Sequence, residues 1–91
     1  MSPVHKNLER GRYEMAISGA TAFVTFSMGP RAMILHHAEV PAALRGQGAG
    51  ARLAAGVLDA IRAEGLKVVP RCGFIADFIA RTPAYQDLLA R

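Results

Sequence analysis

The sequence predicts an α+β fold, from two patterns of apolar residues and a glycine-rich segment between them. Before residue 41, apolar and polar residues alternate, which is typical of half-buried strands. After residue 50, apolar residues recur every three or four positions, which is typical of amphipathic helices. The short connections between the first segments indicate antiparallel neighbours. The predicted order is therefore three strands, a glycine loop, a helix, a strand and a helix.

The first predicted strand begins at Arg12, because Tyr13, Met15 and Ile17 alternate with more polar residues. Gly19 separates this strand from the second, and a Gly-Pro pair at 29 and 30 separates the second strand from the third. A short fourth strand follows the helix. The predicted strands cover residues 12–18, 21–28, 31–40 and 66–69. We expect a mostly antiparallel sheet of about four strands, with almost nothing before the first of them.

Two to three helices are predicted after the glycine loop. In the first, Leu53, Val57 and Ile61 recur at helical spacing, and Gly65 provides a helix stop. A second, short helix is expected over residues 73–81, with four apolar residues turned inward, namely Phe74, Ile75, Phe78 and Ile79. Pro83 can begin a last helical turn, because proline is favoured at the first position of a helix. We expect these helices to pack on the sheet.

Length and composition predict one domain over residues 1–91. Apolar residues make up 52% of the chain, enough for a modest core without a metal or a disulfide. The single cysteine, Cys72, cannot form an intrachain disulfide. Charged residues interrupt the N-terminal region, and no run of about 18 apolar residues could span a bilayer. We expect a cytoplasmic protein that is not attached to a membrane.

The charge pattern bears on the kind of partner. The formal net charge is +4 and the sequence pI is about 10.0, which would suit a polyanion. However, the eleven Lys and Arg residues are spread along the chain with no run of three. Nucleic acid is therefore an unlikely partner. A moderately basic surface also agrees with a ligand that carries phosphate groups.

The segment Arg45-Gly46-Gln47-Gly48-Ala49-Gly50 is the strongest indication of function. Its glycines permit positive φ angles and a close approach of the backbone to a ligand. The start of the following helix would favour a bound pyrophosphate. A P-loop would need Gly-Lys-Ser/Thr where this chain has Gly-Ala-Arg, and the dinucleotide fingerprint lacks its acidic residue about twenty positions later.

The stretch from Val40 to Leu53 resembles the acetyl-CoA loop of the GNAT N-acetyltransferase superfamily, whose pattern is Gln/Arg-x-x-Gly-x-Gly/Ala. Arg45, Gly48 and Gly50 match that pattern. The resemblance continues through residues 67–74 and 82–88. Together these segments are similar to small single-domain GNAT-like proteins. It implies a truncated GNAT-like fold that binds acetyl-CoA and transfers acetyl to an unidentified amine.

The resemblance also implies where acetyl-CoA would bind. The third and fourth strands would splay apart, and the gap would take the pantetheine arm beside the backbone of Val40. The implied cofactor-binding residues are Val40, Arg45, Gly46, Gln47, Gly48, Ala49 and Gly50. No metal is implied. Larger members use regions before the first strand and after the last to build an acceptor pocket, so the acceptor of this chain stays open.

Three residues are candidates for the chemistry, namely Glu39, Cys72 and Tyr85. Glu39, near the end of the third strand, could act as a base, with a solvated surface carboxylate as the alternative. On that strand His36 and His37 would lie on opposite faces, with His37 on the side of Glu39 as a weak proton-relay candidate.

Cys72 and Tyr85 each have a structural alternative. Cys72 precedes a helical segment, where it could accept acetyl as a nucleophile or line the thioester pocket; a buried inert cysteine is the alternative. Tyr85 resembles, in its late position, the tyrosine that protonates the CoA thiolate in many GNAT enzymes; an aromatic anchor is its alternative.

A second class of function is a CoA-binding or partner-binding module that has lost an efficient acceptor site. A homodimer could complete an open cleft, although no residue pattern establishes one.

Overall fold

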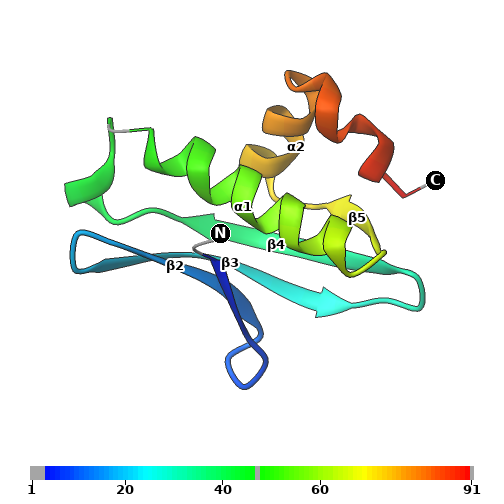
Figure 1. Cartoon of the computed structure of the whole chain (residues 1–91), viewed down its shortest axis with the longest axis horizontal. Helices are drawn as coiled ribbons and strands as arrows, with labels where there is room; N and C mark the ends of the chain where they lie inside the picture. The colour runs from blue at the N-terminus through cyan, green and yellow to red at the C-terminus, as the bar shows by residue number, and fades with distance from the viewer. Residues whose placement is uncertain (1–3, 47, 91) are drawn as a thin grey trace.

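The computed structural model describes residues 4–46 and 48–90. They form a five-stranded sheet in the order β1-β2-β3-β4-β5, and Figure 1 shows the helices lying on one side of it. The elements are β1 (Val4–Asn7), β2 (Arg12–Ile17), β3 (Ala20–Met28), β4 (Ala32–Glu39), the 3-10 helix η1 (Ala42–Leu44), α1 (Ala49–Ala63), β5 (Lys67–Pro70), α2 (Gly73–Ala80) and the 3-10 helix η2 (Pro83–Leu88). The predicted α+β class and GNAT-like fold are confirmed.

The first four strands are antiparallel neighbours joined by short turns, as the alternating segments predicted. β4 and β5 are parallel, with Ala32 opposite Lys67 and Leu35 opposite Pro70. Parallel neighbours need a crossover connection, and α1 supplies it across the sheet. The sheet is therefore mostly antiparallel, with one parallel pair beside the crossover helix.

β1 corrects the expectation that almost nothing precedes the first strand. Its sequence, Val-His-Lys-Asn, has one apolar residue and too little length for an alternating pattern. It pairs with β2, from Val4 opposite Met15 to Asn7 opposite Arg12. It also contacts α1 and its C-cap, more than fifty residues later in the chain. Distant contacts rather than local pattern hold this strand.

The core lies between one face of the sheet and the helices. α1 contributes the apolar stripe that the helical spacing predicted, and α2 adds a smaller one. The buried core residues from the strands are Tyr13, Met15, Ala22, Val24, Met33, Leu35 and Val68, and those from the two α-helices are Ala49, Leu53, Ala54, Val57, Leu58, Ile61, Ile75 and Ile79. Among the described residues, no helix covers the other face of the sheet, here called the outer face.

A bulge in β4 sets the orientation of the strand end that matters for the site. Thr25 pairs with His37 but Phe26 pairs with Leu35, so His36 is an extra residue in β4. The bulge places His36 and His37 together on the outer face, which corrects the prediction of opposite faces. His36 Nε2 accordingly lies 2.7 Å from Ser27 Oγ. After the bulge, Ala38 continues the inner face.

Candidate functional site

The parallel strands β4 and β5 part at Leu35. Its carbonyl accepts hydrogen bonds from the backbone N–H groups of Arg71 at 2.9 Å and Cys72 at 3.0 Å, and no strand pair is formed beyond it. β4 continues to Glu39, whereas the chain after β5 turns away into α2 (Figure 1). The edge of β4 that faced β5 is therefore left without a strand partner over its last residues.

A cleft of about 360 Å³ lies at this parting of the strands. Its walls come from the end of β4, from the loop before α1 and from the first turns of α1 and α2. The lining residues are Ala38, Val40, Arg45, Gly46, Gly50 and Phe74. Ala38, Val40 and Phe74 make part of the cleft apolar, while Arg45 and the glycine backbone supply polar groups.

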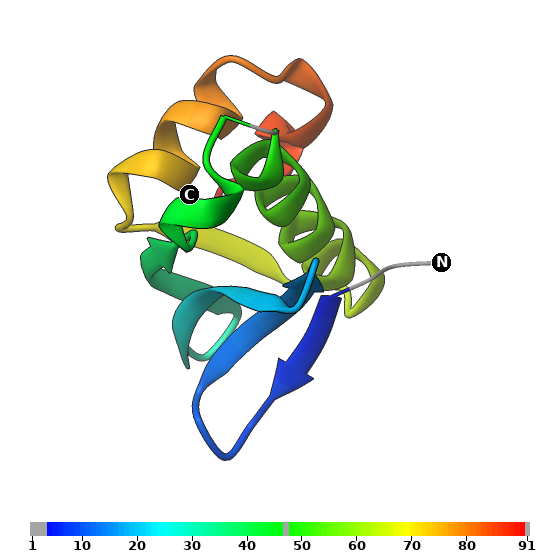
Figure 2. The ribbon, with the colours of Figure 1, turned by 90° about the vertical axis from the view of Figure 1, so that its left-hand side faces the viewer.

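The start of α1 forms one wall of the cleft, at the end of the molecule that Figure 2 faces. Gly48 is the N-cap and adopts a left-handed conformation with φ of 73°. The backbone N–H of Arg52 donates to the Gly48 carbonyl at 3.1 Å. The N–H groups that precede it in the first turn have no acceptor within the helix. Among the described residues, no side chain caps this end and no acidic residue lies in the first turn. The helix dipole there favours a bound anion.

Arg45 links the end of β4 to the glycine loop. Its Nε donates to the Val40 carbonyl at 3.1 Å, which orients the guanidinium beside the cleft. A guanidinium has five N–H donors, so its terminal nitrogens can still reach a phosphate. Arg45 can therefore act both in ordering the loop and in binding an anion.

The structure brings most of the predicted cofactor-binding residues together. Val40, Arg45, Gly46 and Gly50 line the cleft, and Gly48 caps the helix beside it. Ala49 is only 2% exposed and its side chain belongs to the core, so only its backbone can face a ligand. Gln47 lies outside the described residues.

Glu39 lies on the outer face, away from the inner-face side chains of Ala38 and Val40 that line the cleft. Its carboxylate is 3.2 Å from His37 Nε2, and its side chain is 56% exposed. The predicted pairing of Glu39 with the side of His37 is confirmed. A role for Glu39 as a base stays a prediction.

Cys72 lies where the two strands part. It is the N-cap of α2, is 8% exposed and donates its backbone N–H to Leu35. Phe74, two residues later, reaches the cleft. Cys72 is thus two residues from the cleft-lining Phe74, and its catalytic role stays a prediction.

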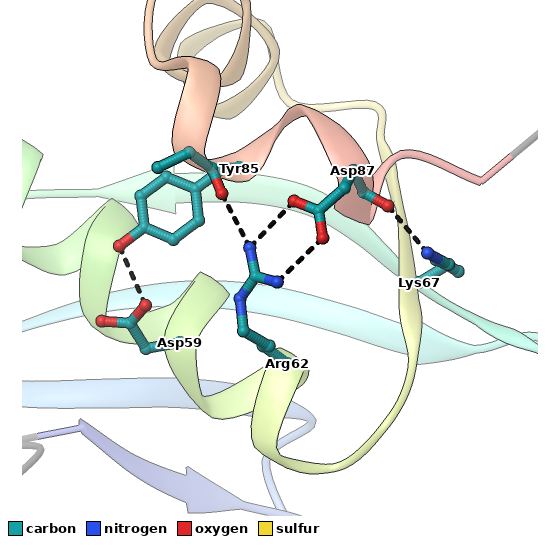
Figure 3. Close-up of polar contacts among 6 residues, drawn as sticks. Asp59, Arg62, Lys67, Tyr85 and Asp87 are labelled. Carbon is teal, nitrogen blue, oxygen red and sulfur yellow. Dashed lines mark hydrogen bonds and ion pairs between the residues drawn. The ribbon is translucent and has the colours of Figure 1, made fainter.

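Tyr85 takes part in a polar network that holds η2 against α1 (Figure 3). Its hydroxyl donates to Asp59 Oδ1 at 2.9 Å, and burial followed by this hydrogen bond raises its pKa. Arg62 donates to both carboxylate oxygens of Asp87, at 2.8 and 3.0 Å. Asp59 is nine residues after the cleft-lining Gly50, which is about 13 Å along the axis of α1. The contacts of Tyr85 are those of an anchor, and its acid role stays a prediction.

Phe74 is the site residue that the sequence analysis assigned to the core. It is 42% exposed and lines the cleft, whereas Ile75 beside it is buried. Its position in the first turn of α2, directly after the parting of the strands, is the signal that could have identified it.

In the described part of the chain, no helix is long and apolar enough to cross a membrane. Over the same residues, no group of three or more His, Cys, Asp or Glu side chains is placed to hold a metal ion.

The fold and the cleft define a small α+β protein with a cleft where two parallel strands separate. A family model described as GCN5-related N-acetyl-transferase matches residues 12–88, and the chain belongs to this family. The chain is also 38% identical over 61 residues to Protein NATD1 of Bos taurus. That alignment covers 67% of this chain and 54% of NATD1, so the match extends over about half the length of that relative. The GNAT resemblance of the sequence is thereby confirmed.

Proposed function

We propose that this chain binds acetyl-CoA in the cleft and transfers its acetyl group to an amine. The observation that carries the proposal is a cleft at the parting of β4 and β5 that combines apolar walls with the start of α1, where no described side chain caps the backbone N–H groups. Membership of the GCN5-related N-acetyl-transferase family supports it.

Two parts of acetyl-CoA, the pyrophosphate and the pantetheine arm, would find suitable walls in the cleft. The pyrophosphate would accept hydrogen bonds from the first N–H groups of α1 and from the guanidinium of Arg45. The pantetheine arm would run beside the unpaired edge of β4, between Ala38 and Phe74. This orientation directs the thioester toward Leu35 and Cys72, where the strands separate.

Acetyl transfer requires removal of a proton from the amine, stabilisation of the oxyanion and protonation of the leaving thiolate. If Cys72 is the nucleophile, its thiolate attacks the thioester carbonyl and releases the CoA thiolate, which takes up a proton. The amine then attacks acetyl-Cys72 and restores the thiol. To act as base and acid, Glu39 would leave His37 and Tyr85 would leave Asp59.

The binding half of the proposal is tested at Gly48. A Cβ atom there meets nothing within 4 Å, so a longer side chain would extend into open space rather than clash. In Gly48→Glu a carboxylate would face the phosphates, and we expect a loss of acetyl-CoA affinity of about 100-fold or more by calorimetric titration.

The matched control is Gly48→Gln, which has the same length and the same backbone strain at positive φ but no charge. The difference between the two variants isolates repulsion of the phosphates. Equal affinities for Gly48→Glu and Gly48→Gln would show that no anion is bound at the start of α1.

The catalytic half is tested by thiol release from acetyl-CoA over a panel of amines. Binding without turnover would favour the second candidate, a CoA-binding or partner-binding module. Absence of binding would remove both candidates.

The variants Glu39→Gln, Cys72→Ala and Tyr85→Phe assign roles in the same assay, because a fall in kcat at unchanged KM marks a residue used in transfer. A cytoplasmic location, a homodimer and the exclusion of nucleic acid stay predictions.

A further inference from the structure

The aromatic ring of Phe74 lies against the backbone of α1 at Gly50. A Cβ atom placed on Gly50 would be 2.9 Å from Cζ of Phe74, with two more ring atoms at 3.5 and 3.7 Å. Side chains do not approach as closely as 2.9 Å without displacement. The ring therefore occupies the space that any other residue at position 50 would need.

Gly50 differs in this respect from the other two glycines of the loop. Gly46 and Gly48 have φ angles of 81° and 73°, and a Cβ atom on either would meet nothing within 4 Å. Their requirement for glycine comes from the left-handed backbone. Gly50 lies within the helix, where the backbone itself would favour alanine. At this position the reason for glycine is therefore the ring of Phe74.

The contact joins two walls of the cleft. Gly50 belongs to α1 and Phe74 to α2, and both line the cleft together with Ala38 and Val40 of the β4 side. Phe74 is 42% exposed, so its ring is held by this contact rather than by full burial in the core.

We propose that Phe74 is a positioning residue for the pantetheine arm and that Gly50 sets the position of its ring, so that the pair fixes the width of the cleft. This inference rests on the proposed function. In Gly50→Ala the added methyl group displaces the ring. Because the ring is the exposed end of a flexible side chain, the fold tolerates this displacement while the cleft changes shape.

A double-mutant cycle tests the inference. We expect Gly50→Ala and Phe74→Ala each to weaken acetyl-CoA binding about tenfold, and the double variant to bind no more weakly than Phe74→Ala. The methyl group has no ring to displace once Phe74 is absent. Gly48→Ala is the matched control, because its backbone strain should cause the same loss of affinity with or without Phe74.

Two further measurements separate positioning from a structural effect. ADP carries the pyrophosphate but no pantetheine arm, so Gly50→Ala and Phe74→Ala should leave its Kd unchanged while Gly48→Glu weakens it. Gly50→Ala keeps its backbone N–H, so its contact with phosphate is retained. The melting temperature of Gly50→Ala should be no lower than that of the wild type, since the exposed ring can move away and alanine is favoured in a helix.

Two results would overturn the inference while acetyl-CoA still binds the wild type: additive losses for Gly50→Ala and Phe74→Ala, or an equal loss of ADP affinity. If the wild type binds neither acetyl-CoA nor ADP, the proposed function fails and the inference fails with it.

Discussion

Tyr13 shows how one buried polar side chain is stabilised in a small core. Its hydroxyl donates to Glu64 Oε2 at 3.0 Å, and Lys6 Nζ lies 2.6 Å from the other carboxylate oxygen. Glu64 is the C-cap of α1, where the negative end of the helix dipole disfavours a carboxylate. Lys6 and Tyr13 offset this cost and connect β1 and β2 to the end of the helix.

The same contacts make stability dependent on pH. Burial, the charge of Glu64 and the hydrogen bond raise the Tyr13 pKa above its usual range. A pKa that is higher in the folded state contributes stability below about pH 10, and this contribution is lost as the pH rises further. We expect Tyr13→Phe to cost about 1 kcal/mol at neutral pH and to remove that decline.

Urea unfolding of the wild type and Tyr13→Phe between about pH 7 and pH 11 measures this effect. Both proteins share Tyr85 and the lysines, so the difference in free energy of unfolding isolates Tyr13. This difference between the wild type and Tyr13→Phe should shrink above about pH 10. A difference that stays constant across this range would contradict the assignment.

At single positions, local sequence brought together the loop residues that line the cleft, whereas Phe74 needed tertiary packing. Arg45, Gly46 and Gly50 are neighbours in sequence, so their shared location follows from one turn of the chain. Phe74 reaches them only because α2 folds back beside α1, and helical periodicity alone placed it in the core. The positions of such residues depend on tertiary packing.

Among the elements, β1 shows why part of the fold was not predictable. The longer strands and α1 carry apolar patterns within their own sequences, whereas β1 has four residues and one apolar side chain. Its place depends on Gly56, since a Cβ atom there would lie 2.5 Å from Val4 Cγ2. The helix and the strand therefore approach closely at a point that no local window contains.

Gly56→Ala tests this packing of β1 on α1. Valine is stiff at χ1, so the added methyl group must displace the strand, and we expect a loss of about 1–3 kcal/mol in the free energy of unfolding. Unfolding in urea measures the loss. Val4→Ala in the same chain should recover part of it, because the smaller side chain leaves room for the methyl group.

The control is the same substitution at Gly73, in the first turn of α2. A Cβ atom there meets nothing within 4 Å, and its φ angle is not positive. Gly73→Ala should be neutral or stabilising by up to about 1 kcal/mol. Equal destabilisation by Gly56→Ala and Gly73→Ala would show that the contact with Val4 is not the cause.

At the scale of the whole fold, one hydrophobic cluster of the described residues joins the sheet to both α-helices. It extends from Tyr13 of β2 through α1 to Ile79 of α2 and Leu88 of η2. The α+β class and the mostly antiparallel sheet could be predicted because short turns and one crossover helix leave few alternative topologies. The prediction of one domain over residues 1–91 concerns cooperativity, which a solution measurement can test.

The two tyrosines provide separate reporters for that test, because the chain has no tryptophan. Tyr13 lies in the sheet core and Tyr85 in η2, near opposite ends of the sequence. In Tyr85→Phe the remaining tyrosine fluorescence reports on β2, and in Tyr13→Phe it reports on η2.

We expect the fluorescence and far-ultraviolet circular dichroism of each variant to share one urea midpoint, as two-state unfolding requires. Tyr13→Phe should unfold at lower urea than the wild type, but with both probes still coincident. If the Tyr85 signal changes before the circular dichroism, η2 unfolds separately from the sheet, and the chain is not one cooperative unit.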